Sequence, residues 1–280
     1  MSARTRRRTG RIVLNIAAVV VFVCSVFPVY WMVNTAFLPG SAVKSDTPHF
    51  WPDEFTLRSF VTAWEDGGFV PALSISLSVT IITVVTALLF GFLASIAVSR
   101  YRFRSRKTFI IAILVIQMIP AEAMIISTFR VLDGWHLLNT VIGLSAVYIA
   151  MVLPFTIWTL RGFVGGVPAD LEEAAMIDGC SRNQAFWRVT FPLLAPGLVS
   201  TGIFAFIQAW NEFVFALVIM TRPESQTLPI WLRSFVQATK ATDWAVVMAG
   251  STLMAIPVII FFLIVQGRMT DGLVSGAVKG

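Results

Sequence analysis

The sequence predicts an all-α membrane protein with six transmembrane helices, and three observations support this fold class. Of its 280 residues, 57% are hydrophobic and only 13% are charged, and the mean hydropathy is +0.81. Soluble domains contain about 45–50% apolar and about 25% charged residues, so this composition nearly excludes a soluble or a disordered chain. Six long apolar stretches follow one another, and basic residues gather at alternate ends of them.

The apolar stretches have lengths that fit a bilayer, because a helix needs about 20 apolar residues to cross the hydrocarbon core. Five stretches of 23 to 33 residues contain no Asp, Glu, Lys or Arg, and the sixth contains only Glu122. The first stretch follows five arginines, but it is longer than the apolar core of a signal peptide, so we expect a retained helix. The prediction is a single transmembrane domain over 1–280, with spans at 12–37, 72–99, 108–130, 139–161, 196–220 and 245–267.

The basic residues predict how the chain is oriented. With the N-terminus inside the cell, 15 of the 21 Lys and Arg residues lie in cytoplasmic segments and 6 lie outside. Cytoplasmic segments of membrane proteins carry an excess of Lys and Arg, so both termini are expected in the cytoplasm. The net charge of +6 is then explained by anionic membrane lipid, and a nucleic-acid partner is excluded.

The cysteines and histidines argue against a disulfide and a metal site, and no motif for binding ATP is present. Cys24 lies in the first predicted span and Cys180 in a cytoplasmic loop, too far apart for a disulfide. His49 and His136 are isolated, which argues against a metal site. No Gly-rich loop with a Lys could hold the phosphates of ATP. We therefore expect a protein that is not an enzyme and does not itself bind ATP.

The cytoplasmic loop 168–192 has an unusual pattern, because it contains start signals for two short helices. Asp170 followed by Glu173 has the spacing of a capping box, and so has Ser181 followed by Gln184. In a capping box the first side chain accepts a hydrogen bond from the third helical amide, and the later side chain returns one. The loop is therefore expected to be structured rather than a flexible connection.

The same loop contains stop signals and small residues. Gly179 is expected to end the first helix, about 171–178, and Pro192 to stop the second. Ala174 and Ala175 allow another surface to approach closely, and the acidic residues beside them would seek an Arg or a Lys on that surface. An amphipathic connector lying on the anionic inner leaflet should be basic instead. The pattern favours a docking helix on the cytoplasmic face.

Three motifs resemble a known family. Glu173-Ala174-Ala175, Asp178-Gly179 and, twelve residues beyond the glycine, Phe191-Pro192 are similar to the EAA loop of ABC-importer permeases. Trp210-Asn211-Glu212-Phe213 and the tail 272–280 narrow the resemblance to the carbohydrate importers, near the MalG-like subunit of the maltose system. The resemblance covers nearly the whole chain. One departure is Cys180, where the family usually has Ala, and we expect it to pack rather than to react.

The resemblance implies the six-helix fold of ABC type I importer permeases and a place in the bacterial cell membrane. It implies that the chain translocates a carbohydrate, a di- or oligosaccharide, into the cytoplasm. ATP would be bound and hydrolysed by a separate ATPase subunit that contacts the 168–192 loop. The residues that would couple the two subunits are Glu172, Glu173, Ala174, Ala175, Asp178 and Gly179.

The resemblance also implies partners. A second, non-identical permease subunit would complete the pathway, and a cytoplasmic ATPase dimer would power it. The tail 272–280 would reach toward the interface of that dimer. The outer loop 221–244 would contact an extracytoplasmic solute-binding protein, although its spacing alone predicts only a polar loop.

Polar residues inside the predicted spans are the candidates for a translocation pathway, because charged groups in lipid usually face a bundle interior. For Glu212 and Asn211, helix–helix hydrogen bonding at a permease contact is an equally good explanation. For Glu122, such a contact or a position at the membrane interface is favoured over a pathway. Tryptophans at 31, 135, 158 and 210 could stack on sugar, but anchoring at the membrane edge is commoner. The candidate pathway residues are Gln117, Gln208, Asn211 and Glu212.

Other functions remain possible from the sequence. The importer could carry another solute, such as a glycerol-phosphate conjugate. A secondary transporter driven by an ion gradient would usually have more helices and internal repeats, and no obvious repeat is present. A membrane scaffold or channel subunit is a third class. Neither of the last two needs the acidic docking loop, which therefore separates them from an ABC importer.

Overall fold

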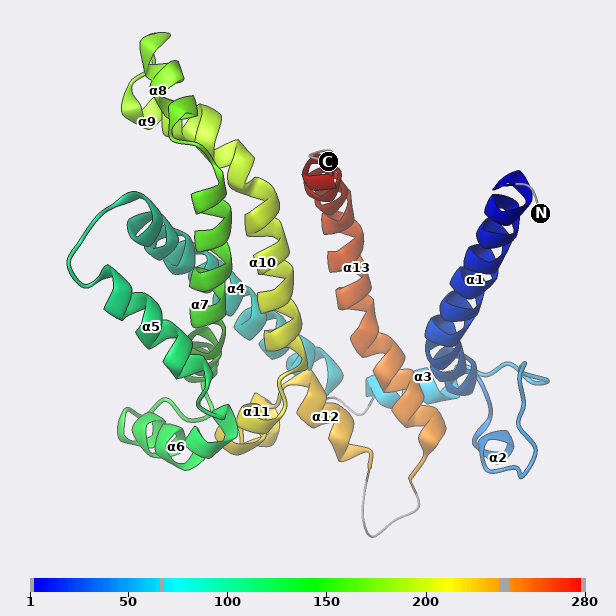
Figure 1. The fold of residues 1–280 in the computed structure, drawn as a ribbon. Helices are drawn as coiled ribbons and strands as arrows, with labels where there is room; N and C mark the ends of the chain where they lie inside the picture. The colour runs from blue at the N-terminus through cyan, green and yellow to red at the C-terminus, as the bar shows by residue number, and fades with distance from the viewer. Residues whose placement is uncertain (1–2, 66–67, 237–241, 278–280) are drawn as a thin grey trace. The chain divides into compact units, whose positions relative to one another are not determined.

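The computed structural model describes residues 3–65, 68–236 and 242–277, and within these ranges the chain forms helices and no strand. Five helices are long and apolar enough to cross a membrane, or six if one bent pair counts as a span. The all-α membrane class predicted from the sequence is confirmed. The long helices are α1 (Ala3–Ala36), α4 (Phe69–Arg100), α7 (Val141–Gly166), α10 (Phe191–Asn211) and α13 (Trp244–Ala277), as Figure 1 shows.

The helices group into two compact units, so the single domain over 1–280 remains a prediction. The first unit comprises residues 1–69 and 232–256, and the second comprises 70–231 and 257–280. The first unit contains α1 and the start of α13. Most of the large apolar side chains of α1 are exposed in the isolated chain, as a surface that faces lipid or another subunit would be.

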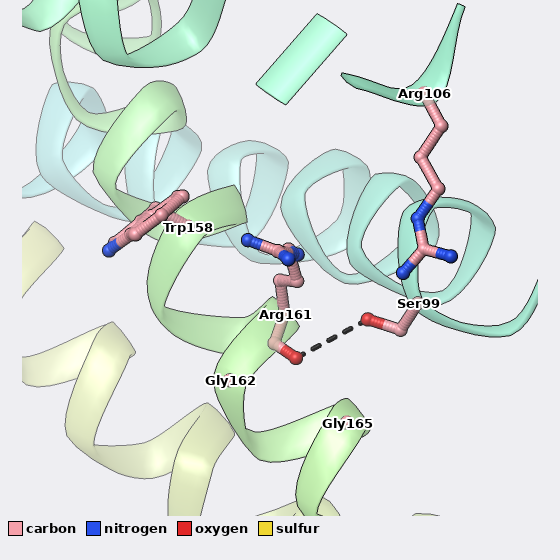
Figure 2. A pocket seen from close by; sticks show the side chains of 6 residues that line it. All are labelled: Ser99, Arg106, Trp158, Arg161, Gly162 and Gly165. Atoms are coloured by element: carbon pink, nitrogen blue, oxygen red, sulfur yellow. Dashed lines mark hydrogen bonds between the residues drawn. The ribbon is translucent and has the colours of Figure 1, made fainter. Parts of the chain in front are cut away.

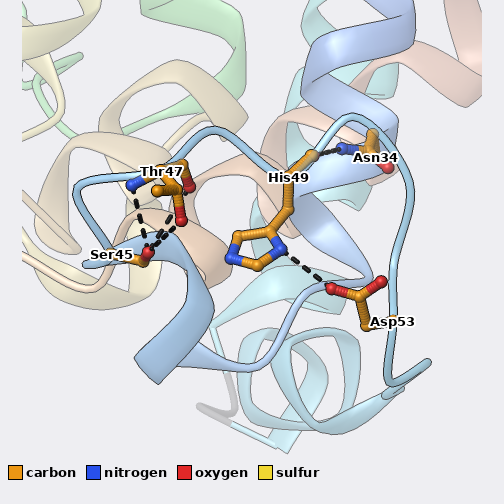
Figure 3. A network of polar contacts seen from close by, with 5 residues as sticks. All are labelled: Asn34, Ser45, Thr47, His49 and Asp53. Carbon is orange, nitrogen blue, oxygen red and sulfur yellow. Dashed lines mark hydrogen bonds and ion pairs between the residues drawn. The ribbon is translucent and has the colours of Figure 1, made fainter.

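In the first unit, polar contacts fix the segment that follows α1. This segment contains the short helices α2 (Gly40–Val43) and α3 (Arg58–Glu65). The Asn34 side-chain amide donates to the His49 carbonyl at 2.8 Å, and His49 Nδ1 contacts an Asp53 carboxylate oxygen at 3.0 Å (Figure 3). Phe37 stacks on Phe55 with ring centroids 4.3 Å apart. These contacts hold the segment in a defined conformation against the end of α1.

In the second unit, close contacts bring α4, α7 and α10 together. A Cβ added at Gly91 of α4 would lie 2.4 Å from the Thr156 methyl of α7. A Cβ added at Gly197 of α10 would lie 2.5 Å from the Phe163 ring of α7. Both helices can approach α7 this closely only because glycine has no side chain.

The third predicted span, 108–130, is not one straight helix. The chain forms α5 (Arg106–Gln117), a 3₁₀ turn, η1 (Ala121–Met124), and α6 (Ile125–Gly134), and the two halves are bent by 90°. Pro120 causes the break, because it lacks an N–H and pushes the preceding residue out of the helical region. Glu122 therefore lies exposed in the turn after the bend and not in mid-helix.

The fifth predicted span, 196–220, begins earlier and is interrupted. Helical structure runs without a gap from Arg182 to Asn211, and after Glu212 and Phe213 the chain resumes as α11 (Val214–Ile219). The other four spans differ from the prediction mainly at their ends. The α7 helix starts after Thr140, whose hydroxyl accepts from the Gly143 amide at 3.0 Å, and extends to Gly166.

Candidate functional site

The docking helix predicted in the 168–192 loop is present as α8 (Asp170–Ile177). Gly179 ends it with φ +93°, a left-handed conformation that favours glycine. The Gly179 amide donates to the Met176 carbonyl at 3.1 Å and the Cys180 amide to the Ala175 carbonyl at 3.0 Å. These two bonds form a Schellman motif, which satisfies carbonyls at the helix end and turns the chain sharply.

The start of α8 differs from the prediction. Ala169, in a helical conformation, precedes the first residue of the helix, and no side chain caps it. The capping box expected between Asp170 and Glu173 is therefore wrong, because Asp170 already lies in the first helical turn. There its carboxylate, with those of Glu172 and Glu173, lies near the positive end of the helix dipole.

The second capping box is confirmed. The Ser181 amide donates to Gln184 Oε1 at 2.9 Å, and the Gln184 amide donates to Ser181 Oγ at 3.3 Å. They start α9 (Arg182–Ala185), which continues through a π-helical turn, η2 (Phe186–Thr190), into α10. Pro192 thus does not stop the helix as predicted. The π turn directly before it widens the helix, which accommodates a residue that cannot donate a hydrogen bond.

Glu172 attaches α8 to two long helices. Its Oε1 lies 3.3 Å from a guanidinium nitrogen of Arg100, the last residue of α4. The same oxygen accepts a hydrogen bond from the Thr190 hydroxyl at 2.6 Å, directly before α10. Both charged side chains are only about a fifth exposed, 22% for Arg100 and 20% for Glu172. A force on α8 would therefore reach α4 and α10 through one carboxylate.

Aromatic side chains connect the 168–192 loop to α4. The Phe92 ring of α4 lies 5.8 Å from that of Phe191 and 6.3 Å from that of Phe186, between ring centroids. Trp187 packs on both Phe186 and Phe191, at 5.3 and 4.8 Å. Aromatic pairs at such distances add to the stability that burial already provides. These ring contacts therefore fix the second half of the loop against α4.

The outward surface of α8 is left open by these contacts. Glu173, Ala174, Asp178 and Gly179 are exposed, and no hydrogen bond or ion pair of the described residues involves the Glu173 carboxylate. Ile177 is 86% exposed. A carboxylate, a small residue and an unprotected apolar side chain on one short helix form a surface suited to a groove on another protein.

Comparison with known proteins places the chain in a family. Residues 87–273 match the family of binding-protein-dependent transport system inner membrane components. The chain belongs to this family. The match includes the whole 168–192 loop and the structure on both sides of it. As an inner membrane transport component, the chain is a multi-pass membrane protein.

Relatives of this inner membrane component match along almost their whole length. The chain is 47% identical over 271 residues to the diacetylchitobiose uptake system permease protein DasC of Streptomyces coelicolor. This match covers 97% of this chain and 98% of DasC. The chain is 35% identical over 257 residues to the trehalose transport system permease protein SugB of Mycobacterium tuberculosis, covering 91% and 93%.

A solved structure supports the importer-permease fold. A chain from the crystal structure of a bacterial ABC transporter involved in the import of the acidic polysaccharide alginate superposes with a TM-score of 0.78. The superposition covers 95% of this chain and 98% of that one, at 24% identity. At this identity the likeness shows the fold alone. The six-span ABC type I importer permease fold implied by the sequence is confirmed.

The candidate pathway residues of this inner membrane component differ in their surroundings. Glu212 binds groups of its own chain: its carboxylate accepts from the Tyr148 hydroxyl at 2.6 Å and from the amides of Phe215 and Ala216 at 2.8 and 3.1 Å. It therefore caps α11 where α10 breaks off and joins the break to α7. Asn211, Gln208 and Gln117 are exposed. Their role in translocation remains a prediction.

Three of these four tryptophans, at 135, 158 and 210, differ in their surroundings. Trp210 is 2% exposed and stacks on Phe206 with ring centroids 5.6 Å apart, so it belongs to the core and not to a membrane edge. Trp135 is exposed, whereas Trp158 lies against Arg161 at 5.2 Å. The positions of the last two suit the edge of a membrane.

The outer segment 221–244 is more than the polar loop that its spacing predicts. It contains η3 (Pro223–Ser225) and α12 (Leu228–Ser234), and residues 237–241 lie outside the described part. Asn139, at φ 59°, accepts hydrogen bonds through Oδ1 from the Arg222 amide at 2.9 Å and the Ser225 hydroxyl at 3.0 Å. Leu228 is fully buried. This part of the segment is a fixed platform.

Several residues that build the site were not found by sequence reasoning. Arg100 and Thr190 bind Glu172, Tyr148 binds Glu212, and Asn139 fixes the outer platform. Each lies in a hydrophobic or basic stretch of the sequence, and its partner lies 18 to 86 residues away in the chain. Sequence spacing therefore does not reveal these contacts. Asn139 carried a weak signal, since Asn tolerates a left-handed conformation in turns.

Proposed function

We propose that this chain is a permease subunit of an ABC importer that moves a carbohydrate, a di- or oligosaccharide, into the bacterial cytoplasm. The names of two relatives, which specify diacetylchitobiose and trehalose, support this class of solute. The observation that carries the proposal is α8 with its open face and its anchoring through Glu172. A channel subunit or an ion-driven transporter has no use for such a helix.

The proposed mechanism begins at an ATPase dimer, which binds and hydrolyses ATP. Its cleft receives α8, where a basic residue pairs with Glu173 and the exposed Ile177 fills an apolar depression. When the ATPase dimer closes, α8 moves with it. The Glu172 bonds to Arg100 and Thr190 transfer the movement to α4 and α10, while the Schellman turn at Gly179 keeps α8 from unwinding.

The proposed partners follow from surfaces that this chain leaves open. A second, non-identical permease covers apolar side chains such as those of α1. A solute-binding protein on the outer side contacts the 221–244 segment and delivers the sugar. Both termini are cytoplasmic in this arrangement, in line with the uneven distribution of Lys and Arg.

Transport by a reconstituted system tests the proposal. The chain is co-expressed with its candidate partner permease, ATPase and binding protein, and the purified complex is placed in proteoliposomes. Uptake of labelled disaccharide should require both internal ATP and the binding protein, and the ATPase should co-purify with the chain. Uptake driven by an ion gradient without ATP, or by this chain and an ATPase with no second permease, would contradict it.

A further inference from the structure

A basic cavity lies between the ends of α4, α5 and α7, apart from the contacts that hold α8. Its volume is about 370 Å³, and it is lined by Ser99, Arg106, Trp158, Arg161, Gly162 and Gly165. One water occupies about 30 Å³ of liquid, so the cavity has room for a group much larger than a water molecule. Figure 2 shows that the guanidinium groups of Arg106 and Arg161 come from different helices, α5 and α7, and line the same cavity.

No carboxylate of a described residue pairs with either arginine of the cavity. Among the residues that the structure describes, the one carboxylate paired with an arginine is Glu172, and its partner is Arg100. Arg106 and Arg161 are half-buried and have no acidic neighbour within ion-pair distance. Two partly desolvated guanidiniums that share a cavity repel each other, and an anion bound between them would relieve this repulsion.

The cavity is also built to stay open. The guanidinium of Arg161 lies over the Trp158 ring at 5.2 Å, which fixes its direction. The Ser99 hydroxyl donates to the Arg161 carbonyl at 3.3 Å and holds the end of α4 against α7. A Cβ on Gly162 or Gly165 would meet nothing within 4 Å, so space remains beside both positions.

We propose that this cavity binds a phosphate diester, and specifically the headgroup of an anionic membrane lipid. Arginine pairs with phosphate through two parallel hydrogen bonds, which suits a site with two guanidiniums. Basic pockets between helices at the membrane surface are typical sites for acidic headgroups.

The surroundings favour a lipid over a free anion. The cavity lies where spans end, and α5 continues from Arg106 with exposed apolar side chains, including Ile111 at 59% and Val115 at 52% exposed. Acyl chains attached to a headgroup in the cavity can cover this surface, which free phosphate cannot do. The inference requires only that the chain spans a membrane and does not depend on which solute is carried.

Lipid binding by the full chain in a neutral detergent tests the inference. Phosphatidylglycerol, phosphatidylcholine and inorganic phosphate are titrated separately, and bound lipid is counted by native mass spectrometry. The double variant Arg106→Gln/Arg161→Gln should bind phosphatidylglycerol about 25-fold more weakly, since each basic residue contributes about fivefold to the binding of anionic lipid. Phosphatidylcholine should bind the unchanged chain no better than it binds this variant.

Two further variants separate the cavity from general charge and from misfolding. Arg102→Gln/Arg104→Gln removes two exposed charges of the same basic run that do not line the cavity, and it should keep most of the binding. Arg106→Lys/Arg161→Lys keeps the charge and should bind better than the Gln pair.

Three results would overturn the inference. An equal loss in Arg102→Gln/Arg104→Gln would mean that no specific site exists. Equal binding of phosphatidylglycerol and phosphatidylcholine to the unchanged chain would mean that the cavity does not select an anion. Displacement of phosphatidylglycerol by millimolar inorganic phosphate would assign the cavity to the free anion instead of a lipid.

Discussion

Two interruptions of helical structure, one between α8 and α9 and one after α10, use carboxylates in opposite ways. At the break after α10, Glu212 is occupied by three donors of its own chain. In the 168–192 loop, two adjacent carboxylates have different surroundings. Glu172 binds Arg100 and Thr190, whereas Glu173 is exposed. An acidic residue in a membrane protein therefore indicates contact with a partner only when its own chain leaves it unpaired.

Removing the Glu212 carboxylate should have the largest effect on stability. Glu212→Ala leaves the amides of Phe215 and Ala216 without their acceptor, and it leaves the Tyr148 hydroxyl only the more distant backbone carbonyl of residue 212, at 3.5 Å. Each unsatisfied buried group costs about 1–3 kcal/mol, so we expect a total loss of about 3 kcal/mol or more. Unfolding in detergent, followed by tryptophan fluorescence, measures it.

Asn211→Ala is the matched control for this variant. The Asn211 side chain is exposed and donates only to the Ile207 carbonyl of its own helix, at 2.9 Å. Its loss should change stability by less than about 0.5 kcal/mol. Equal losses for Glu212→Ala and Asn211→Ala would show that Glu212 does not hold the break together.

The second prediction concerns the anchoring of α8. Glu172→Ala should destabilise the loop by about 2 kcal/mol, because a hydrogen bond to a charged group contributes about 1.5–3 kcal/mol. A double-mutant cycle with Arg100→Ala should give a coupling energy of about 1 kcal/mol. Hydrogen exchange of the amides in 170–190 reports the local stability. Strictly additive effects of the two substitutions would show that Glu172 and Arg100 do not hold α8 together as a pair.

The third prediction concerns the turn after α8. Gly179→Ala should cost about 1–2 kcal/mol, because an L-residue is strained at φ +93°. Steric clash does not contribute, since a Cβ there meets nothing within 4 Å. Gly162→Ala has equally open space but lies inside α7, where alanine is favoured over glycine. Gly162→Ala should therefore be neutral or stabilising, and an equal loss in both variants would contradict the account of the turn.

The sequence predicted the parts of this structure that depend on local rules. The apolar lengths indicated the membrane spans, and the Ser181–Gln184 spacing and Gly179 marked two helix ends that the structure contains. Local rules failed where the context changed a residue's role. Pro192 continues a helix because a π turn precedes it, and Pro120 bends a span that the apolar length predicts as one helix.

The polar residues inside the spans required tertiary information. Glu212 could be assigned neither to a pathway nor to a helix contact from the sequence, because Tyr148, its deciding partner, lies 64 residues earlier. The same holds for Glu172. From the sequence, its partner Arg100 is only one of the basic residues that indicate how the chain is oriented in the membrane. Sequence spacing can locate a carboxylate at a helix end, but it cannot tell whether a distant side chain already satisfies it.

ATP hydrolysis by the assembled transporter with Glu173→Gln tests whether the exposed carboxylate of α8 couples the permease to its ATPase. This substitution keeps the size and shape of the side chain and removes its charge. Because Glu173 is exposed, the stability should change by less than about 0.5 kcal/mol. Losing one partner of a desolvated charge pair costs about 2–5 kcal/mol, so coupling to the ATPase should suffer strongly.

The control is Asp133→Asn, which removes an exposed carboxylate at the end of α6, far along the chain from the 168–192 loop. Both variants should insert and fold, and Asp133→Asn should retain full activity. Glu173→Gln should lose most of the ATP hydrolysis that is stimulated by the binding protein and its sugar. Normal stimulation and normal uptake by Glu173→Gln would contradict the claim that the free carboxylate of α8 links the permease to its ATPase.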